Sequence, residues 1–375
     1  MLDQVKGPQD ALAELQMFRD ALKTDVAALT KEIALRDKMN HQAVQPLCAR
    51  IDIAIRDYSS GFLRRLRAMR RDQEAEAEDR DAVVDMRREW GIAHSRTSLF
   101  QVELNQWSLM KALVARQVAS RKKRVPLYET RRTALGAVQS AASDDVFDLV
   151  HAILNPEKQS DEAFQSGCFP DIALRNSRFH EHLHAAYRVL LAQGRTQPMR
   201  FLDVGCGGGL KVLSALRYFK RCDGLDYQQS YIDTARSLLE RAKACESNAF
   251  QADALMFEGY DTYDIIYFYK PIRDDQKLVE MEQRVADLAR PGTVLIAPYV
   301  GFEARCAGLG CGQVAGSVFL AKTSQKEADR WRRRAERTGV AVVHAEDERV
   351  ATIWTPLLEA SRYAGYDIER FKPLV

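Results

Sequence analysis

A glycine-rich segment between residues 201 and 211 has the clearest chemical meaning in the sequence. It reads FLDVGCGGGLK, with four glycines among five residues after a short apolar run. Glycine permits a tight backbone turn and lets a ligand approach without a Cβ in the way. The first N–H groups of a following helix can bind polar or anionic ligand atoms. The segment therefore predicts a nucleotide-type binding loop at the carboxyl end of a parallel strand.

Details of this loop exclude two common kinds of nucleotide site. A dinucleotide loop has Gly or Ala at its sixth position, and here Leu210 stands there. No Gly-Lys-Ser or Gly-Lys-Thr sequence follows, so the loop is not a P-loop. Asp203, two residues before the first glycine, suits a cationic ligand such as an amine or a sulfonium.

Two more carboxylates follow at the ends of later apolar runs. Asp226, in the sequence GLDY, can accept hydrogen bonds from both hydroxyls of a ribose. Asp253, in the sequence QADALMF, can accept a hydrogen bond from an adenine amino group. Both acids are expected at the sheet edge that holds the glycine loop, because the carboxyl ends of parallel strands share one edge.

Together these motifs resemble the class I S-adenosylmethionine-dependent methyltransferases. LDVGCGGG resembles the first motif of that family, GLDY the second and QADALMF the third, while YDIIYFYKP and RPGTVLIAPY resemble its fourth and fifth strands. The resemblance covers residues 178–300. It implies a Rossmann-like α/β domain with a doubly wound, mainly parallel sheet, which uses S-adenosylmethionine as cofactor and is an active methyltransferase. The alternative is an inactive relative with the same fold.

The resemblance also implies a role for individual residues. Asp203 and the glycines would shape the methionine side of the pocket, Asp226 would hold the ribose and Asp253 the adenine. The full set of expected cofactor-binding residues is Asp203, Gly205, Cys206, Gly207, Gly209, Asp226, Tyr227, Asp253, Ala254 and Phe268. A structural role for Asp203 and a loop-capping role for Asp253 stay open.

The expected catalytic residues are Tyr269 and Lys270, which follow the fourth strand beside the implied position of the methyl group. Methyl transfer is an in-line displacement, so the main contribution of the enzyme is to align acceptor, methyl carbon and sulfur. A general base is needed only if the acceptor must lose a proton.

Three histidines and two cysteines are weaker candidates for chemistry. His180, His182 and His184 could act as bases on the acceptor side, or they could be structural or solvated. Neither these histidines nor the isolated pair Cys306 and Cys311 has the ligand pattern of a metal site, so no metal is expected.

The fourth motif limits the acceptor, which stays unidentified. Enzymes that methylate amino groups of adenine and glutamine carry Asp/Asn-Pro-Pro-Tyr/Phe at this place, whereas residues 268–271 read FYKP. A small molecule or glycan precursor is favoured, because the catalytic part is close to neutral and has no nucleic-acid motif. A protein side chain or a nucleic acid is not excluded.

The elements that position these residues follow from the hydrophobic pattern. Apolar runs alternate with amphipathic segments from residue 199 onward, which predicts a mainly parallel sheet covered on both faces. Strands are expected at 199–205, 223–227, 249–254, 263–269 and 293–299, and helices at 210–219, 231–244 and 275–289. Beyond them we expect a Gly/Cys-rich loop at 301–316 that serves as lid or acceptor wall, strands at 317–321 and 340–344, and helices at 325–338 and 354–364.

The first part of the chain has a helical composition, rich in Ala, Leu, Arg, Glu and Gln. Leu15, Leu22 and Leu29 repeat every seven residues, and Val26 and Ile33 occupy the other seam position. This stripe predicts a short coiled coil. It would either pack inside a helical bundle of the same chain or join two chains in a homodimer.

These patterns predict three parts: an all-α helical domain at 1–155, a connector at 156–177 and the methyltransferase domain at 178–375. No run of about 20 apolar residues is present, so no membrane span is expected. The first ten residues lack the features of a secretory signal, and seven scattered cysteines indicate a reducing cytoplasm. The alternative function is a non-catalytic helical adaptor with a relic cofactor pocket.

Overall fold

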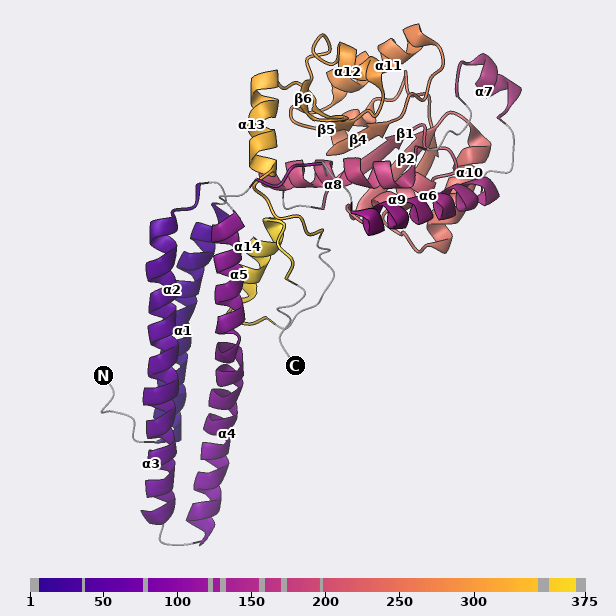
Figure 1. Ribbon diagram of the computed structural model, residues 1–375. Helices are drawn as coiled ribbons and strands as arrows, with labels where there is room; N and C mark the ends of the chain where they lie inside the picture. The colour runs from indigo at the N-terminus through magenta and orange to yellow at the C-terminus, as the bar shows by residue number, and fades with distance from the viewer. Residues whose placement is uncertain are drawn as a thin grey trace. The chain divides into compact units, whose positions relative to one another are not determined.

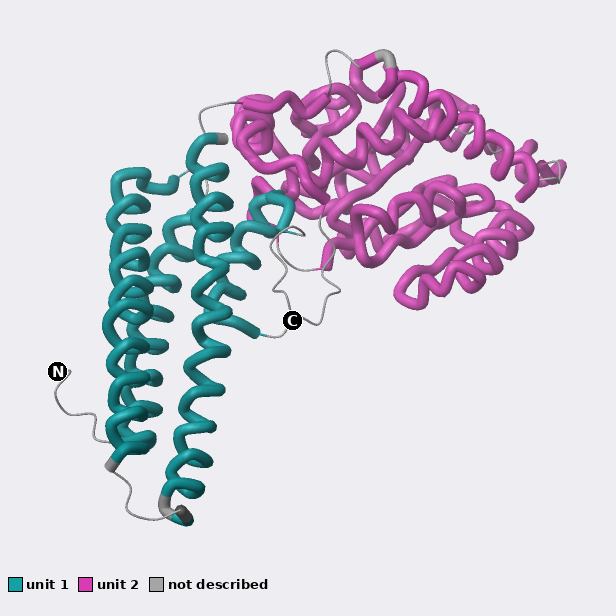
Figure 2. The backbone as a smooth tube through the Cα atoms, turned by 60° about the horizontal axis from the view of Figure 1, so that its bottom comes forward, with its two compact units in different colours: residues 1–123, 346–375 teal, residues 124–345 magenta. Residues whose placement is uncertain are grey.

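The structure is a computed structural model that describes residues 7–35, 38–76, 80–120, 124–128, 133–154, 159–169, 174–195, 198–342 and 351–368 (Figure 1). The chain forms two compact units, drawn in different colours in Figure 2. The first unit comprises residues 1–123 and 346–375, and the second comprises residues 124–345. The boundaries predicted at 155 and 177 both lie within the second unit.

The first unit is a helical bundle. Its elements are α1 (Pro8–Ala34), α2 (His41–Arg56), the π-helical segment η2 (Asp57–Phe62), α3 (Leu63–Glu76), α4 (Arg80–Asn105), α5 (Trp107–Ser120) and α14 (Thr355–Tyr363). All five residues of the leucine stripe on α1 are buried, and α1 contacts α2, α4 and α14 of its own chain. For this stripe the structure therefore shows packing within one bundle, the first of the two interpretations that the sequence left open.

The C-terminal helix belongs to this bundle, although the sequence placed it in the catalytic domain. The indole of Trp354 is fully buried and stacks on Trp107, with ring centroids 5.3 Å apart. Its Nε1 donates a hydrogen bond to the backbone oxygen of Glu103 at 2.6 Å. Gln117 Nε2 donates to Ser361 Oγ at 2.7 Å. These contacts place residues 351–368 among the helices rather than on the sheet.

A seven-stranded sheet forms the centre of the second unit, in the order β3-β2-β1-β4-β5-β7-β6. The strands are β1 (Arg200–Val204), β2 (Arg221–Asp226), β3 (Ala249–Gln251), β4 (Ile265–Phe268), β5 (Val294–Ile296), β6 (Gly312–Ala315) and β7 (Val318–Leu320). The first five strands are parallel, and β7 runs antiparallel to β5 and β6. The predicted Rossmann-like, mainly parallel sheet is confirmed.

Helices cover both faces of this sheet (Figure 1). They are α6 (Ala134–Leu154), α7 (Asp161–Gln165), α8 (Asn176–Gln193), α9 (Leu210–Ala215), α10 (Gln229–Arg241), the 3-10 helix η3 (Gly259–Thr262), α11 (Asp275–Leu288), α12 (Val300–Arg305) and α13 (Gln325–Ala335). Phe201 and Tyr267 pack with α8, α9, α10 and α13 on one face. Leu202 and Phe268 pack with α11 and α12 on the other. Both faces are buried, which explains why the strand sequences are continuously apolar.

The prediction of a long loop at 301–316 is wrong. Helix α12 and strand β6 occupy most of this range, and β6 pairs with β7 in an antiparallel hairpin. A Cβ on Gly312 would lie 2.8 Å from the Cβ of Ala328, so glycine there permits close packing of α13 rather than mobility. The strand predicted at 340–344 is absent from 340–342, and the remainder of that range lies outside the described residues.

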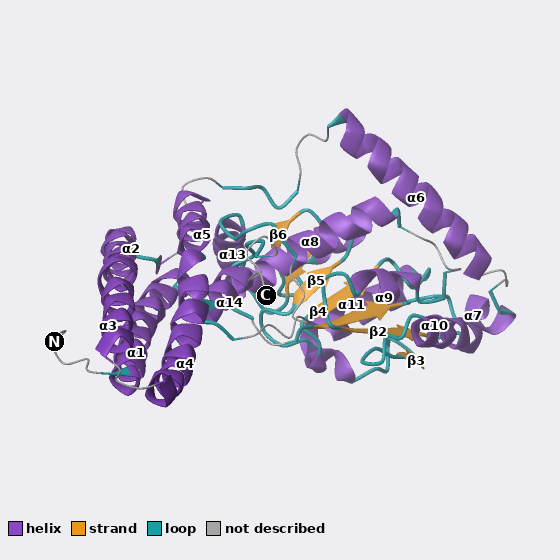
Figure 3. Cartoon of the chain, turned by 90° about the horizontal axis from the view of Figure 1, so that it is seen from below, coloured by secondary structure: helices purple, strands orange, loops and turns teal. Residues whose placement is uncertain are grey.

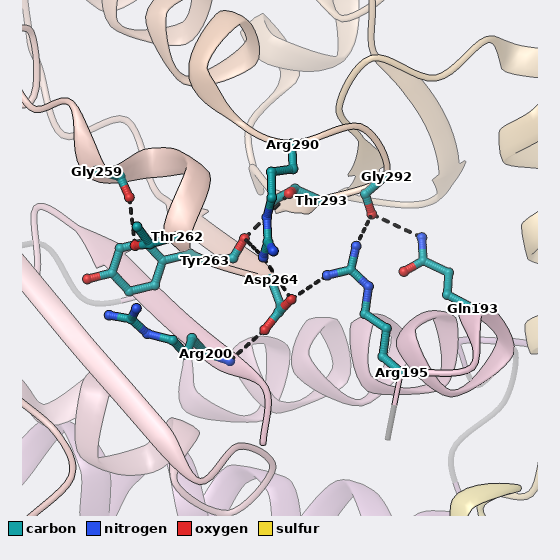
Figure 4. Close-up of polar contacts among 10 residues, drawn as sticks. All are labelled: Gln193, Arg195, Arg200, Gly259, Thr262, Tyr263, Asp264, Arg290, Gly292 and Thr293. Carbon is teal, nitrogen blue, oxygen red and sulfur yellow. Dashed lines mark hydrogen bonds and ion pairs between the residues drawn. The ribbon is translucent and has the colours of Figure 1, made fainter. Parts of the chain in front are cut away.

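One carboxylate joins several elements at the amino-terminal edge of the sheet (Figure 4). Asp264 pairs with Arg195 and, at 3.1 Å, with Arg290, and it accepts a hydrogen bond from the backbone N–H of Arg200 at 2.9 Å. Gln193 Nε2 donates to Gly292 O at 3.0 Å. These contacts connect the end of α8 with the starts of β1, β4 and β5.

No helix in the described ranges is long and apolar enough to cross a bilayer.

Replacing Leu29 by Ala should destabilise the helical unit, because its side chain is fully buried. A Leu→Ala change at such a position costs about 2–5 kcal/mol of unfolding free energy. Urea unfolding followed by circular dichroism measures this. Met17→Ala on the same helix is the matched control, since that side chain is 59% exposed. Equal stability of the two variants would contradict burial of the stripe within the bundle.

Candidate functional site

A cavity of about 350 Å³ lies at the carboxyl ends of the parallel strands. Parallel sheets place their ligand sites at this edge. The structure brings most of the predicted site residues together in its wall. They are Asp203, Gly205, Cys206, Gly207, Asp226, Tyr227, Asp253, Ala254, Tyr269 and Lys270.

The glycine loop after β1 has a backbone that only glycine adopts easily. Gly205, Gly207 and Gly209 have φ of 79°, 53° and 82°, in the left-handed region. A Cβ on Gly205 would lie 2.7 Å from the Cβ of Pro271. The N–H groups of residues 205 and 206 both donate to Leu225 O, at 2.8 and 3.0 Å. The loop is thus fixed between the ends of β2 and β4.

Asp226 connects the glycine loop to the tip of β2. Its Oδ2 accepts a hydrogen bond from Gly207 N, and its Oδ1 accepts one from Gln228 N, both at 2.9 Å. A carboxylate has about four lone-pair sites. The side chain can therefore organise the loop and still accept hydrogen bonds from a ligand in the cavity.

Asp203 on β1 and Asp253, just after β3, line the same cavity, with β2 between their strands. Asp203 is only 2% exposed and lies in register with Gly224 and Tyr267. Asp253 Oδ1 accepts from Leu255 N at 2.8 Å, so it caps the loop after β3 and also lines the cavity. Each carboxylate favours positive charge on the part of a ligand that lies near it, while Lys211, Lys270 and Lys277 line other parts of the same cavity.

A wall that the sequence did not predict comes from residues 159–169, which were expected to be part of a connector. Cys168 forms a β-bridge with Ile272, and Phe169 N donates to Pro271 O at 3.3 Å. Ser166 Oγ donates to Tyr227 Oη at 3.2 Å. No local pattern marks this segment, because its partners lie about 60 to 105 residues further along the chain.

The pKa of the Cys168 thiol depends on burial and on the charges around the cavity. Burial, followed by the nearby carboxylates of Asp226 and Asp253, raises the pKa of Cys168 to about 11. The thiol is therefore neutral at physiological pH. Since the thiolate is the reactive form, Cys168 serves as a wall residue rather than as a nucleophile.

Aromatic and basic side chains form another part of the wall. Tyr269 and Lys270 follow β4, and Phe169, Lys277 and Tyr299 lie around the same cavity. Lys270 has φ of 46°, a conformation that costs about 1–3 kcal/mol for a residue other than glycine. Its Nζ lies 3.7 Å from Asp275 Oδ1 and 5.5 Å from the ring centroid of Phe169. Such strain at a strand end is typical of a functional site.

A buried carboxylate holds Tyr299 in place. Tyr299 Oη donates to Glu282 Oε1 at 2.7 Å, and Arg305 binds both oxygens of the same carboxylate at 2.6 and 2.8 Å. Burial and the charge of Glu282 raise the pKa of Tyr299. The phenol is therefore protonated, with its ring fixed against the cavity.

Two predicted cofactor-binding residues are not in the described cavity wall. Gly209 is the N-cap residue of α9, and a Cβ there would lie 2.7 Å from the Cβ of Ala235, so glycine at this position allows close helix packing. Phe268 is fully buried on the opposite face of the sheet from Tyr267, with its ring 5.2 Å from that of Phe302. Neighbouring side chains on a strand point to opposite faces of the sheet. The prediction that Phe268 binds the cofactor did not take this alternation into account.

The three candidate histidines lie away from this cavity. His182 Nδ1 is hydrogen bonded to Tyr128 Oη at 3.0 Å, and His184 Nε2 to Val340 O at 2.8 Å. Burial lowers the pKa of His180 and of His182 to about 4, so both rings are neutral at pH 7. Their positions give no support to a role as acceptor-side bases.

Helix α6 adds a further wall residue, His151, which the sequence prediction missed. Nearby, Lys211 also lines the cavity and donates from Nζ to Leu174 O at 2.6 Å. The same Nζ lies 3.9 Å from the ring centroid of Phe147 on α6. The spacing of residues in α6 contains no catalytic motif, so only the fold could reveal this contribution.

Comparison with protein families gives one match. A family model described as a methyltransferase domain matches residues 201–292, which run from β1 to the loop before β5. This segment contains the glycine loop and all three cavity carboxylates. No curated protein is similar enough in sequence to count as a match.

Solved structures with low similarity include several methyltransferases. An amino pentose methyltransferase, CalS10, from Micromonospora echinaspora is 23% identical, with 37% of this chain and 56% of that chain covered and a TM-score of 0.28. An RNA methyltransferase from Salinibacter ruber is 19% identical, with 34% and 76% covered and a TM-score of 0.27. The chain spans 50% and 56% of the first two structures that it matches. Scores this low give no information about the acceptor.

Replacing Gly205 by Ala should lower thermal stability through both backbone strain and contact with Pro271. Gly194→Ala is the matched control, because Gly194 has the same φ of 79° but no atom within 4 Å of the place that a Cβ would take. The control measures the loss of stability that comes from the backbone conformation alone, about 1 kcal/mol. We expect Gly205→Ala to lose at least about 1 kcal/mol more, since the added atom meets a packed ring. Equal melting temperatures would show that the loop can move away from Pro271.

Proposed function

We propose that this chain, which carries a class I S-adenosylmethionine-dependent methyltransferase domain, transfers a methyl group to a small-molecule or glycan-precursor acceptor. The observation that carries the proposal is the convergence of Asp203, Asp226 and Asp253 on one cavity beside the glycine loop. The volume of about 350 Å³ lies within the usual range of small-ligand sites, about 300–1,000 Å³.

The residues fit the cofactor part by part. When bound, S-adenosylmethionine supplies a methyl group activated by a sulfonium. Asp226 would accept hydrogen bonds from the ribose hydroxyls and Asp253 from the adenine amino group. Asp203 and the loop around Gly207 would face the methionine end, where the carboxylate of Asp203 would stabilise positive charge. The protein contributes position and electrostatics, and the activated methyl group belongs to the cofactor.

The acceptor would bind against Phe169, Tyr269 and Tyr299. Aromatic side chains can pack against the flat face of a small molecule or sugar ring. The hydrogen bond from Tyr299 to Glu282 would hold one of these rings in place. Lys270 and Lys277 would orient polar groups on the acceptor. Holding the acceptor in line with the methyl group is the step that these residues perform.

We also propose that the helical unit, residues 1–123 and 346–375, recruits the acceptor or a second chain, and that the unit of residues 124–345 carries out methyl transfer. A homodimer would need a surface other than the buried stripe of α1. A cytoplasmic location is supported by the cysteines, all seven of which are free.

A thermal shift with S-adenosylhomocysteine tests cofactor binding. At about 100 times its dissociation constant, the ligand should stabilise the protein by about 2.7 kcal/mol. Absence of any shift would favour the helical adaptor with a relic pocket. Incubation of host extract with a radiolabelled methyl donor then identifies which fraction, small molecule, protein or nucleic acid, takes up label.

Replacing Asp226 by Asn should weaken S-adenosylhomocysteine binding at least tenfold. The substitution keeps the size of the side chain but removes a charged acceptor, which costs about 1.5–3 kcal/mol for hydrogen bonds to charged groups. Calorimetry measures the affinity, and Asp261→Asn at an exposed position controls for the loss of one charge. Unchanged affinity with an intact fold would remove the ribose assignment.

Replacing Tyr269 by Ala should lower turnover sharply and change cofactor affinity by less than about 1 kcal/mol, the size of one neutral hydrogen bond. Only the alignment of acceptor and methyl group would be disturbed. Label transfer in extract and calorimetry measure the two quantities. Joint loss of thermal stability and cofactor binding would instead make Tyr269 a packing residue, and wild-type behaviour in both assays would exclude both roles.

A further inference from the structure

Helix α6 has one face that is covered by the rest of the second unit and an opposite, apolar face that is exposed. On the covered face, Asp144 accepts hydrogen bonds from Ser177 N and Oγ at 2.7 and 2.8 Å. Phe147 is 6% exposed beneath the Lys211 ammonium, and His151 lines the cavity. These residues are spaced by three or four positions, as one side of a helix requires.

The opposite side of α6 carries a second stripe with the same kind of spacing. It consists of Leu135, Val138, Ala142, Val146, Leu149 and Ile153. Its leucines, valines and isoleucine are between 62% and 68% exposed. In Figure 3, α6 lies at the margin of the second unit, away from the sheet. We call this set the α6 stripe.

The stripe is too regular to be a chance scatter of surface residues. Single exposed apolar residues are normal on a protein surface, whereas a contiguous apolar patch marks an interaction site. Successive members lie three or four residues apart along five turns of helix, the pattern with which one amphipathic helix packs on another. Small residues beside the stripe, Ala141 and Ala152, would allow close approach.

Charge on α6 decides which helix would fit. The helix contains three aspartates and neither Lys nor Arg. Asp145 and Asp148 are exposed beside the stripe. In an antiparallel pair of α6 helices from two copies, these acids would approach one another, and like charges at flanking positions are unfavourable. An anionic lipid surface would be repelled for the same reason.

We propose that the α6 stripe is a docking site for an amphipathic helix of a partner protein whose apolar face is flanked by Lys or Arg. Basic flanks would pair with Asp145 and Asp148, as charged positions beside a coiled-coil seam do. Because the covered face of the same helix supplies His151 to the cavity wall, a docked partner is held beside the methyl-transfer site. The consequence for methyl transfer rests on the proposed function, whereas docking on the stripe does not.

Two synthetic helical peptides test the proposal on the full-length protein. Both are fluorescein-labelled amphipathic helices of about six turns with the same leucine stripe, one flanked by Lys and the other by Glu. Fluorescence anisotropy should show at least tenfold tighter binding of the Lys peptide. The double variant Val146→Gln/Leu149→Gln should weaken that binding at least tenfold, and Asp145→Lys/Asp148→Lys should reverse the preference between the peptides.

Val340→Gln is the matched control, because Val340 is an exposed valine of the same unit outside the stripe, and it should bind the Lys peptide as the parent does. Circular dichroism checks that each variant is folded. The proposal is overturned if neither peptide binds, if both bind equally, or if the stripe variant binds like the parent. It is also overturned if light scattering finds a dimer of the parent that Val146→Gln/Leu149→Gln converts to a monomer, because a second copy would then occupy the stripe.

Discussion

The close approach of Gly205 to Pro271 is the contact on which the cavity depends. A side chain at residue 205 would come within 2.7 Å of the proline ring, so the ends of β1 and β4 can meet only with glycine there. Lys270, next to that proline, adopts a left-handed conformation that a side chain disfavours. The glycine at one strand end and the strained lysine at the other allow the glycine loop and residues 269–271 to line one cavity.

Two carboxylates of the site organise the loops around them and also line the cavity. Asp226 holds the glycine loop through Gly207 N, and Asp253 caps the turn after β3, yet both face the cavity. Their charge, with burial, raises the pKa of the Cys168 thiol, which shows that residues 159–169 sit within the same field. Burial beside this wall lowers the local dielectric constant, which strengthens the attraction between the carboxylates and positive charge on a ligand.

The helical unit is built from both ends of the chain. Trp354, near the C-terminal end of the described residues, stacks on Trp107 and is hydrogen bonded to the backbone at Glu103. The second unit is therefore an insertion between two parts of the bundle, residues 1–123 and 346–375. A change that loosens α14 would weaken the bundle even though it lies far from α1 in sequence.

Local chemistry was predictable from the sequence alone. The glycine loop, the strand alternation and the acids at positions 203, 226 and 253 follow from neighbouring residues, and each of these acids lines the cavity. The leucine stripe of α1 was also visible, because helical periodicity is a local property. The sequence could not show whether that stripe packs within its own chain or against a second chain, because both arrangements bury the same side chains.

The sequence by itself determined the fold class, the loop and the carboxylates, because their signals depend on backbone propensity and short-range spacing. Only the tertiary structure decided that Ser166 and Cys168 form a wall, that Phe268 turns away from the cavity, and that Trp354 belongs to the helical unit. The physical reason is that these features depend on contacts between segments far apart in sequence. Cys168 pairs with Ile272, and Trp354 stacks on Trp107, about 250 residues earlier in the chain. Such contacts produce no periodic pattern in the sequence of either segment.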